Sequence, residues 1–111
     1  MNERDIGYAN DIILACQDVI EFSGGMDHQR FRETRMAQAA IIRELEVIGE
    51  VVKRLSLEFK AAHPGIDWRG WAGLRDQLIH GYDEVDLDLV WSIVQNDIRP
   101  LLQEVQPYFT E

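Results

Sequence analysis

The sequence predicts an all-α fold, an antiparallel up-and-down bundle of four main helices with a short extra helix or rim segments. Apolar residues recur at steps of three and four along most of the chain, which is the spacing of amphipathic helices. No stretch of useful length alternates apolar and polar residues as a half-buried strand does. The chain has 111 residues, of which 46% are hydrophobic and 28% charged. We therefore expect one globular domain covering residues 1–111.

Two helices are predicted in the first half of the chain. The first covers residues 3–22 and ends at the Ser-Gly-Gly sequence of 23–25. The second begins at Asp27, a good N-cap, and runs to about residue 56. Its apolar residues form a heptad seam of Ile41, Leu45, Ile48, Val52, Leu55 and Phe59. Because this helix is longer than most globular helices, we expect packing, including packing against another subunit, to hold it.

The second half predicts a turn and two more helices. Pro64 and Gly65 make a turn after His63, and Asp67 then caps a short helix that runs through to His80. Residues 81–85 are predicted to be a loop. Asp86 caps the last helix, in which Pro100 is expected to produce a kink. The buried residues expected there are Val90, Val94, Ile98, Leu101 and Val105.

The net charge of −9 argues against broad, non-specific binding of DNA or RNA. Any contact with RNA would have to be local, in a cleft where arginines outweigh the surrounding carboxylates. No apolar run approaches the roughly 18 to 20 residues that span a bilayer. Cys16 is the only cysteine and cannot form an internal disulfide. Together these features favour a cytoplasmic protein that binds neither membrane nor DNA.

Residues 74–82 concentrate the groups best suited to chemistry. Arg75, His80 and Tyr82 supply a permanent cation, a titratable imidazole and a phenol, a set suited to phosphate chemistry. In a straight helix His80 would point about 140° away from Arg75. Gly81 offers a helix end in a left-handed turn, which would allow His80 and Tyr82 to swing toward Arg75.

This pattern of Arg, four residues, His, one residue and Tyr resembles the signature of HEPN-domain ribonucleases. The flanking residues and the helix order resemble the HepT branch, the toxin half of HepT–MntA type toxin–antitoxin pairs. Asp83 departs from that branch, which often has an aromatic residue after the motif Tyr. The other matching residues are Ile48-Gly49-Glu50, Asp67-Trp68-Arg69, Ala72-Gly73-Leu74-Arg75-Asp76, Val85-Asp86 and Trp91.

The resemblance implies a type VII-like toxin, a helical homodimer that cleaves RNA without a metal or another cofactor. Arg75 and His80 would line a cleft between the two subunits. Tyr82 would be the residue to which a nucleotidyltransferase antitoxin transfers AMP. The alternative kept open is a non-catalytic, nucleotide-binding or adaptor module that partners such a transferase.

Metal-free RNA cleavage needs a base, an acid and a cation for the phosphate. One His80 per chain cannot fill both proton-transfer roles at once, whereas a two-fold dimer brings a second copy. Arg75 suits the phosphate because its planar fork binds two oxygens. Asp76, four residues before His80, either orients the imidazole or forms only a solvent-facing pair. Glu50 either forms a salt bridge with Arg75 or faces water.

The remaining candidates favour structural roles. His28 and His63 have no partners at metal-ligand spacing, so we interpret both as solvated loop residues. Cys16 lies on the apolar face of the first helix and is expected in the core. For Trp68, Trp71 and Trp91, packing is favoured over base stacking.

Overall fold

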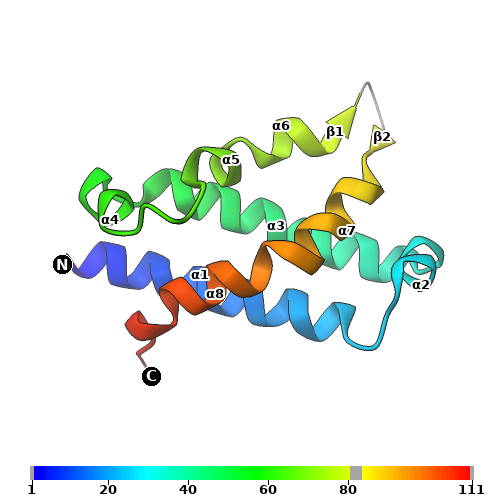
Figure 1. The fold of residues 1–111 in the computed structure, drawn as a ribbon, viewed down its shortest axis with the longest axis horizontal. Helices are drawn as coiled ribbons and strands as arrows, with labels where there is room; N and C mark the ends of the chain where they lie inside the picture. The colour runs from blue at the N-terminus through cyan, green and yellow to red at the C-terminus, as the bar shows by residue number, and fades with distance from the viewer. Residues whose placement is uncertain (1, 81–83, 111) are drawn as a thin grey trace.

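The computed structural model describes residues 2–80 and 84–110, without the side chains of Ile79 and His80. Two long antiparallel helices, α1 (Glu3–Ser23) and α3 (Arg35–Arg54), form the back of the bundle. The pair α5 (Trp68–Ala72) and α6 (Leu74–Leu78) and the pair α7 (Leu87–Asn96) and α8 (Ile98–Val105) supply the other two rods. Figure 1 shows the up-and-down order of these four rods. The predicted helical bundle is confirmed.

One continuous apolar core joins the four rods. From α1 it takes Ile12, Ile13, Cys16 and Val19, and from α3 the predicted seam residues Ile41, Leu45, Ile48 and Val52, all fully buried. The predicted core positions of the last helix are buried too. Cys16, Trp68 and Trp71 lie in this core, as the sequence predicts.

The predicted single helix over residues 27–56 is wrong, because the chain breaks twice. Asp27 does cap a helix, with its carboxylate accepting from the Arg30 amide at 2.8 Å, but α2 (His28–Glu33) is short. The carbonyl groups at the end of α2 are bound by a residue of the next helix. The side-chain amide nitrogen of Gln38 donates to the Phe31 and Arg32 carbonyl oxygens. The break at Thr34 lets α2 turn toward α7.

The second break follows α3 and is set by a buried carboxylate. Asp5, only 3% exposed, accepts hydrogen bonds from the Ser56 amide (2.9 Å) and hydroxyl (2.6 Å). The Ser56 hydroxyl in turn accepts from the Phe59 amide and so caps α4 (Leu57–Ala62). Leu55 therefore adopts an extended backbone, and Phe59 still reaches the core, though from a separate helix.

The predicted third helix ends earlier than expected. Asp67 caps α5 through the Gly70 amide, as predicted, but Gly73 separates α5 from α6 and the helix stops at Leu78. Ile79–His80 (β1) is extended and pairs antiparallel with Glu84–Val85 (β2), so His80 lies opposite Glu84. The predicted role of Gly81 as a helix end lies outside the described residues.

The last predicted helix is confirmed with its kink. Asp86 caps α7 by accepting from the Leu89 amide at 3.0 Å. Pro100 has no amide hydrogen to donate to the Asn96 carbonyl, and the chain bends at Asp97, between α7 and α8. A short 3₁₀ helix, η1 (Gln106–Tyr108), then packs against α1 and α8.

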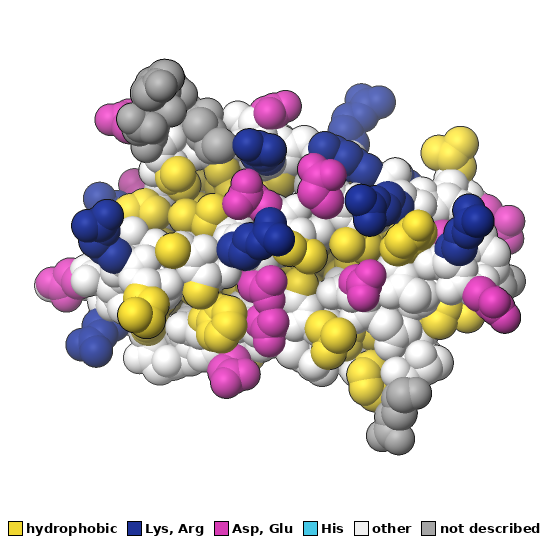
Figure 2. All heavy atoms as spheres, turned by 180° about the vertical axis from the view of Figure 1, so that it is seen from behind, with side chains coloured by type: hydrophobic (Ala, Val, Ile, Leu, Met, Phe, Trp, Pro, Cys, Tyr) yellow, Lys and Arg dark blue, Asp and Glu magenta, His cyan; other side chains and the backbone are white. Residues whose placement is uncertain are grey.

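The rear surface mixes both signs of charge. Figure 2 shows basic and acidic side chains interspersed over this face, with hydrophobic side chains exposed between them. The large hydrophobic side chains that are exposed in the described part of the chain include Leu14, Phe22, Met36, Leu57 and Phe109. Among the described residues, no helix is long and apolar enough to cross a bilayer.

Candidate functional site

Arg75 is held at the surface by the packing of α6. Leu74 and Leu78 anchor that helix in the core, so the side chain at position 75 must face outward. Its side chain is 70% exposed, so the guanidinium can reach a ligand. The Arg75 Nε atom lies 3.8 Å from Oε2 of Glu46 on α3.

A small cavity of about 120 Å³ lies beside Arg75, between α3 and the α5–α6 rod. Its walls carry two carboxylates, from Glu46 and Glu50, and a second cation, from Arg43. Of the two alternatives for Glu50, the salt bridge with Arg75 is not formed. Glu50 is 57% exposed and binds Lys53 at 3.1 Å, whereas Arg75 pairs with Glu46, one turn earlier. The cavity is lined by Arg43, Glu46, Gly49, Glu50, Ala72 and Arg75.

The other motif residues can be placed only in part. The backbone of His80 is in β1, beyond the end of α6, and its side chain lies outside the described residues. Tyr82 lies outside them entirely. Asp76 is exposed, but because the helix ends at Leu78, the helical i, i+4 relation between Asp76 and His80 is lost. An orienting role for Asp76 therefore cannot rest on helical geometry.

His63 corrects a prediction, because it is not a solvated loop residue. Its side chain is only 11% exposed. Its Nδ1 lies 2.6 Å from a carboxylate oxygen of Glu104, and its Nε2 lies 2.7 Å from the hydroxyl oxygen of Tyr108. The ring also contacts Phe59 at a centroid distance of 4.7 Å. This network fastens the C-terminal turn to the end of α4, far from Arg75 in the bundle (Figure 1).

His28 also has partners that the sequence does not show. Its Nε2 lies 3.0 Å from the Asp88 carboxylate, which Arg32 binds as well. The imidazole stacks on Trp91, whose indole in turn stacks on Phe31. This cluster joins α2 to α7 and confirms packing as the role of Trp91. Among the side chains that the structure describes, which exclude that of His80, no three His, Cys, Asp or Glu groups converge as metal ligands.

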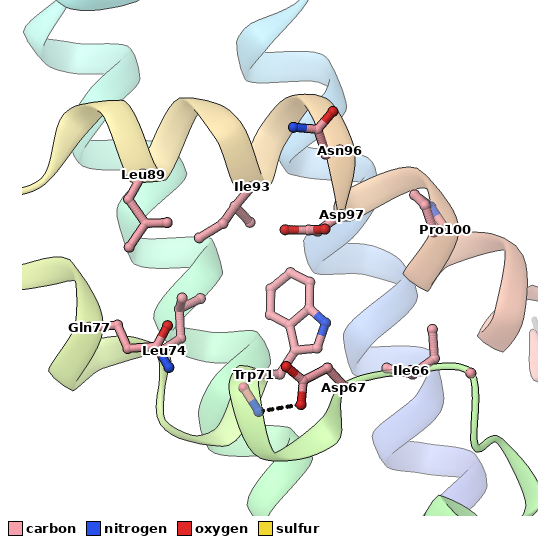
Figure 3. Close-up of a pocket in the computed structure, with 12 residues that line it drawn as sticks. Ile66, Asp67, Trp71, Leu74, Gln77, Leu89, Ile93, Asn96, Asp97 and Pro100 are labelled. Carbon is pink, nitrogen blue, oxygen red and sulfur yellow. Dashed lines mark hydrogen bonds between the residues drawn. The ribbon is translucent and has the colours of Figure 1, made fainter.

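A larger groove of about 330 Å³ lies between the α5–α6 rod and the α7–α8 rod. Figure 3 shows the Trp71 indole between the carboxylates of Asp67 and Asp97, with Leu74, Leu89 and Ile93 along one side. Partial burial and, to a smaller extent, the negative charge of Asp67 raise the pKa of Asp97. The groove is thus acidic and apolar, unsuited to a phosphate.

Two further groups have altered acidity. Burial, a hydrogen bond to Asp18 and the charge of Asp18 raise the pKa of Glu44 to about 7, against a smaller opposing effect of Arg43. Burial alone raises the pKa of the Cys16 thiol to about 12, so this cysteine is neutral and unreactive in the core.

Glu46 is the residue of this site that sequence reasoning missed. It lies on the long helix, just before the stretch Ile48-Gly49-Glu50 that resembles the HepT branch, and four residues before Glu50. Glu46 and Glu50 are four residues apart and lie on the same face of α3, so the sequence alone does not show which of them contacts Arg75. The difference between them arises only from the position of α6 against α3.

The helical bundle, with an exposed arginine on α6 and a histidine just past the end of that helix, is consistent with the class of HEPN-like proteins. Comparison with known protein families identifies the branch of this class. The model of the family described as "Ribonuclease HepT-like" matches residues 12–108. The chain belongs to this family, which confirms the resemblance seen in the sequence.

Curated relatives support the assignment over most of their length. "Putative RNase MJ1380" of Methanocaldococcus jannaschii is 36% identical over 107 residues, or 96% of this chain and 98% of that protein. "Probable ribonuclease HepT" of Thermococcus cleftensis is 40% identical over 94 residues, or 85% of this chain and 86% of that protein. "Putative RNase TTE0752" of Caldanaerobacter subterraneus is 34% identical over 99 residues, or 89% and 88%. No solved structure gave a significant match.

Proposed function

We propose that this chain is an endoribonuclease toxin that cleaves RNA without a metal, acts in the cytoplasm and forms a homodimer. The observation that carries the proposal is family membership over residues 12–108, combined with an intact Arg75–His80–Tyr82 signature. The exposed guanidinium of Arg75 supports it, because a phosphate can reach this group without any movement of the core.

The reaction is attack by a ribose 2′-oxygen on the adjacent phosphorus. One imidazole takes the proton of the 2′-hydroxyl as the new P–O bond forms, and a second gives a proton to the departing 5′-oxygen. The products are a 2′,3′-cyclic phosphate and a 5′-hydroxyl end. The two imidazoles are His80 of each subunit, and Arg75 binds the non-bridging oxygens as negative charge builds on them.

Tyr82 is the proposed point of control. Its hydroxyl helps to position the phosphate in the active dimer. A cognate nucleotidyltransferase antitoxin transfers AMP to the phenol oxygen, and pyrophosphate leaves from ATP. The added phosphate carries negative charge into a site that binds RNA phosphates, and like charges repel. The modified dimer is therefore unable to bind its substrate productively.

The second candidate function is a non-catalytic module that serves as the face on which a nucleotidyltransferase acts. One observation favours it: two carboxylates, Glu46 and Glu50, line the same small cavity as Arg75. They weaken the local positive potential that an RNA strand needs, in a chain whose net charge is already −9. Such a module would bind its partner without cutting RNA.

Incubation of the purified chain with total RNA and a chelator separates the two functions. The nuclease proposal expects cleavage by the wild type and none by His80→Ala or Arg75→Ala, with every variant still dimeric by light scattering. His28→Ala is the matched control, because it removes an imidazole outside the motif and should leave cleavage intact. Undegraded RNA with a folded wild-type dimer would favour the binding module.

A further inference from the structure

The contact between Glu46 and Arg75 crosses from one rod of the bundle to another. Glu46 is on α3 and is 30% exposed, whereas Arg75 is on α6 and is 70% exposed. The better-buried partner is therefore the carboxylate, whose helix is packed firmly against α1. An exposed arginine has many rotamers, and a fixed negative charge at its base restricts them.

The atoms involved leave the useful edge of the guanidinium free. Glu46 Oε2 approaches Nε of Arg75, at 3.8 Å. Among the described residues, Arg75 has no second ion-pair partner, so the edge formed by its two terminal nitrogens is open. That edge offers parallel N–H donors to two phosphate oxygens. A carboxylate at Nε can thus orient the guanidinium without competing with the phosphate for the N–H donors of the terminal nitrogens.

The position of this pair depends on a close approach between two helices. A Cβ atom at Gly49 would lie 2.7 Å from the backbone oxygen of Trp71, so α3 and α5 touch there at a distance that only glycine allows. Glu46 lies three residues before Gly49 on α3, and Arg75 lies four residues after Trp71, on α6 beyond Gly73. The glycine contact therefore sets how far apart the carboxylate and the guanidinium lie.

We propose that Glu46 is a positioning residue that holds the Arg75 guanidinium with its terminal edge toward the RNA phosphate. This inference rests on the proposed nuclease function. It assigns Glu46 no contact with the substrate. Its effect is on the orientation of Arg75 in the transition state, where misplacement of a binding group is costly.

Glu50 provides a matched control within the same cavity. It is on the same helix, carries the same charge and is paired with Lys53 instead of Arg75. Removing either glutamate changes the net charge by the same amount and takes one carboxylate from the same cavity. A difference between Glu46→Ala and Glu50→Ala therefore reports the contact with Arg75, and equal effects report charge alone.

The experiment measures kcat and KM with random-sequence RNA oligonucleotides that carry a fluorophore and a quencher. Glu46→Ala should lower kcat by about tenfold or more, with a smaller change in KM. Glu46→Gln should keep more of the rate than Glu46→Ala, because a polar side chain of the same length still lies beside Nε. Glu50→Ala should stay within about twofold of the wild type. Equal rates for Glu46→Ala and Glu50→Ala, or a faster Glu46→Ala, would overturn the inference.

A second measurement does not depend on nuclease activity. The ¹H–¹⁵N resonance of the Arg75 Nε–H group should shift in Glu46→Ala and stay in place in Glu50→Ala. If the wild type cuts no RNA, the proposed function fails and the catalytic consequence of Glu46 fails with it. If the wild type cuts RNA but the Arg75 Nε–H resonance does not shift in Glu46→Ala, only the positioning role is wrong.

Discussion

Replacing Gly49 with alanine adds a methyl group at the place where α3 lies closest to α5. The new Cβ atom would lie 2.7 Å from the Trp71 carbonyl oxygen, about 0.7 Å short of the 3.4 Å at which ordinary contact begins. A backbone atom cannot rotate away, so the helices must separate. Overpacking of this kind costs about 1–3 kcal/mol. The helix itself gains about 0.5–1 kcal/mol from alanine. We therefore expect a net loss of up to about 2.5 kcal/mol.

Gly7 is the control, since it is an exposed helical glycine whose added Cβ atom meets nothing within 4 Å. Gly7→Ala should gain stability through helix propensity alone, by about 0.5–1 kcal/mol. Urea unfolding, monitored by circular dichroism, gives the free energy of unfolding of both variants. The slope m should stay the same as in the wild type. If Gly49→Ala is as stable as Gly7→Ala, then α3 and α5 do not approach as the structure shows.

The remaining predictions concern the buried network and one titrating group. His63→Ala loses two hydrogen bonds and the contact with Phe59, and should cost about 2–3 kcal/mol in urea unfolding. His28→Ala, which removes a half-exposed side chain, should cost less than about 1 kcal/mol. Glu44→Gln tests pH dependence. Because folding raises the pKa of Glu44 from 4.5 to about 7, the wild type loses stability as pH rises through that window. The variant should match the wild type near pH 4 and have the higher melting temperature at pH 8; an unchanged difference across this range would contradict the assignment.

Local signals predicted much of the fold. Asp27, Asp67 and Asp86 are recognisable as N-caps because each interaction lies within three residues in sequence. The seam of α3 and the kink before Pro100 are also local, since periodicity and a missing amide hydrogen can be read directly. These features needed no knowledge of the rest of the chain.

The errors arise where distant residues decide the local structure. The end of α3 depends on a carboxylate at Asp5, whose partner Ser56 is 51 residues away. His63 looked like an exposed turn residue because Glu104 and Tyr108 follow it by 41 and 45 residues. The same limit applies to the site. The sequence predicted Arg75, but Glu46 became distinguishable from Glu50 only once α6 was placed against α3.

In the proposed mechanism one active site needs His80 from both subunits, and dimers that combine two kinds of chain can test this requirement. Wild-type and His80→Ala chains with different affinity tags are co-expressed, and the dimer carrying both tags is purified. RNA cleavage by this mixed dimer is compared with that of both pure dimers. If the active site is shared, the mixed dimer is nearly as inactive as the His80→Ala dimer. Cleavage at half the wild-type rate would mean that each subunit works alone, and would contradict it.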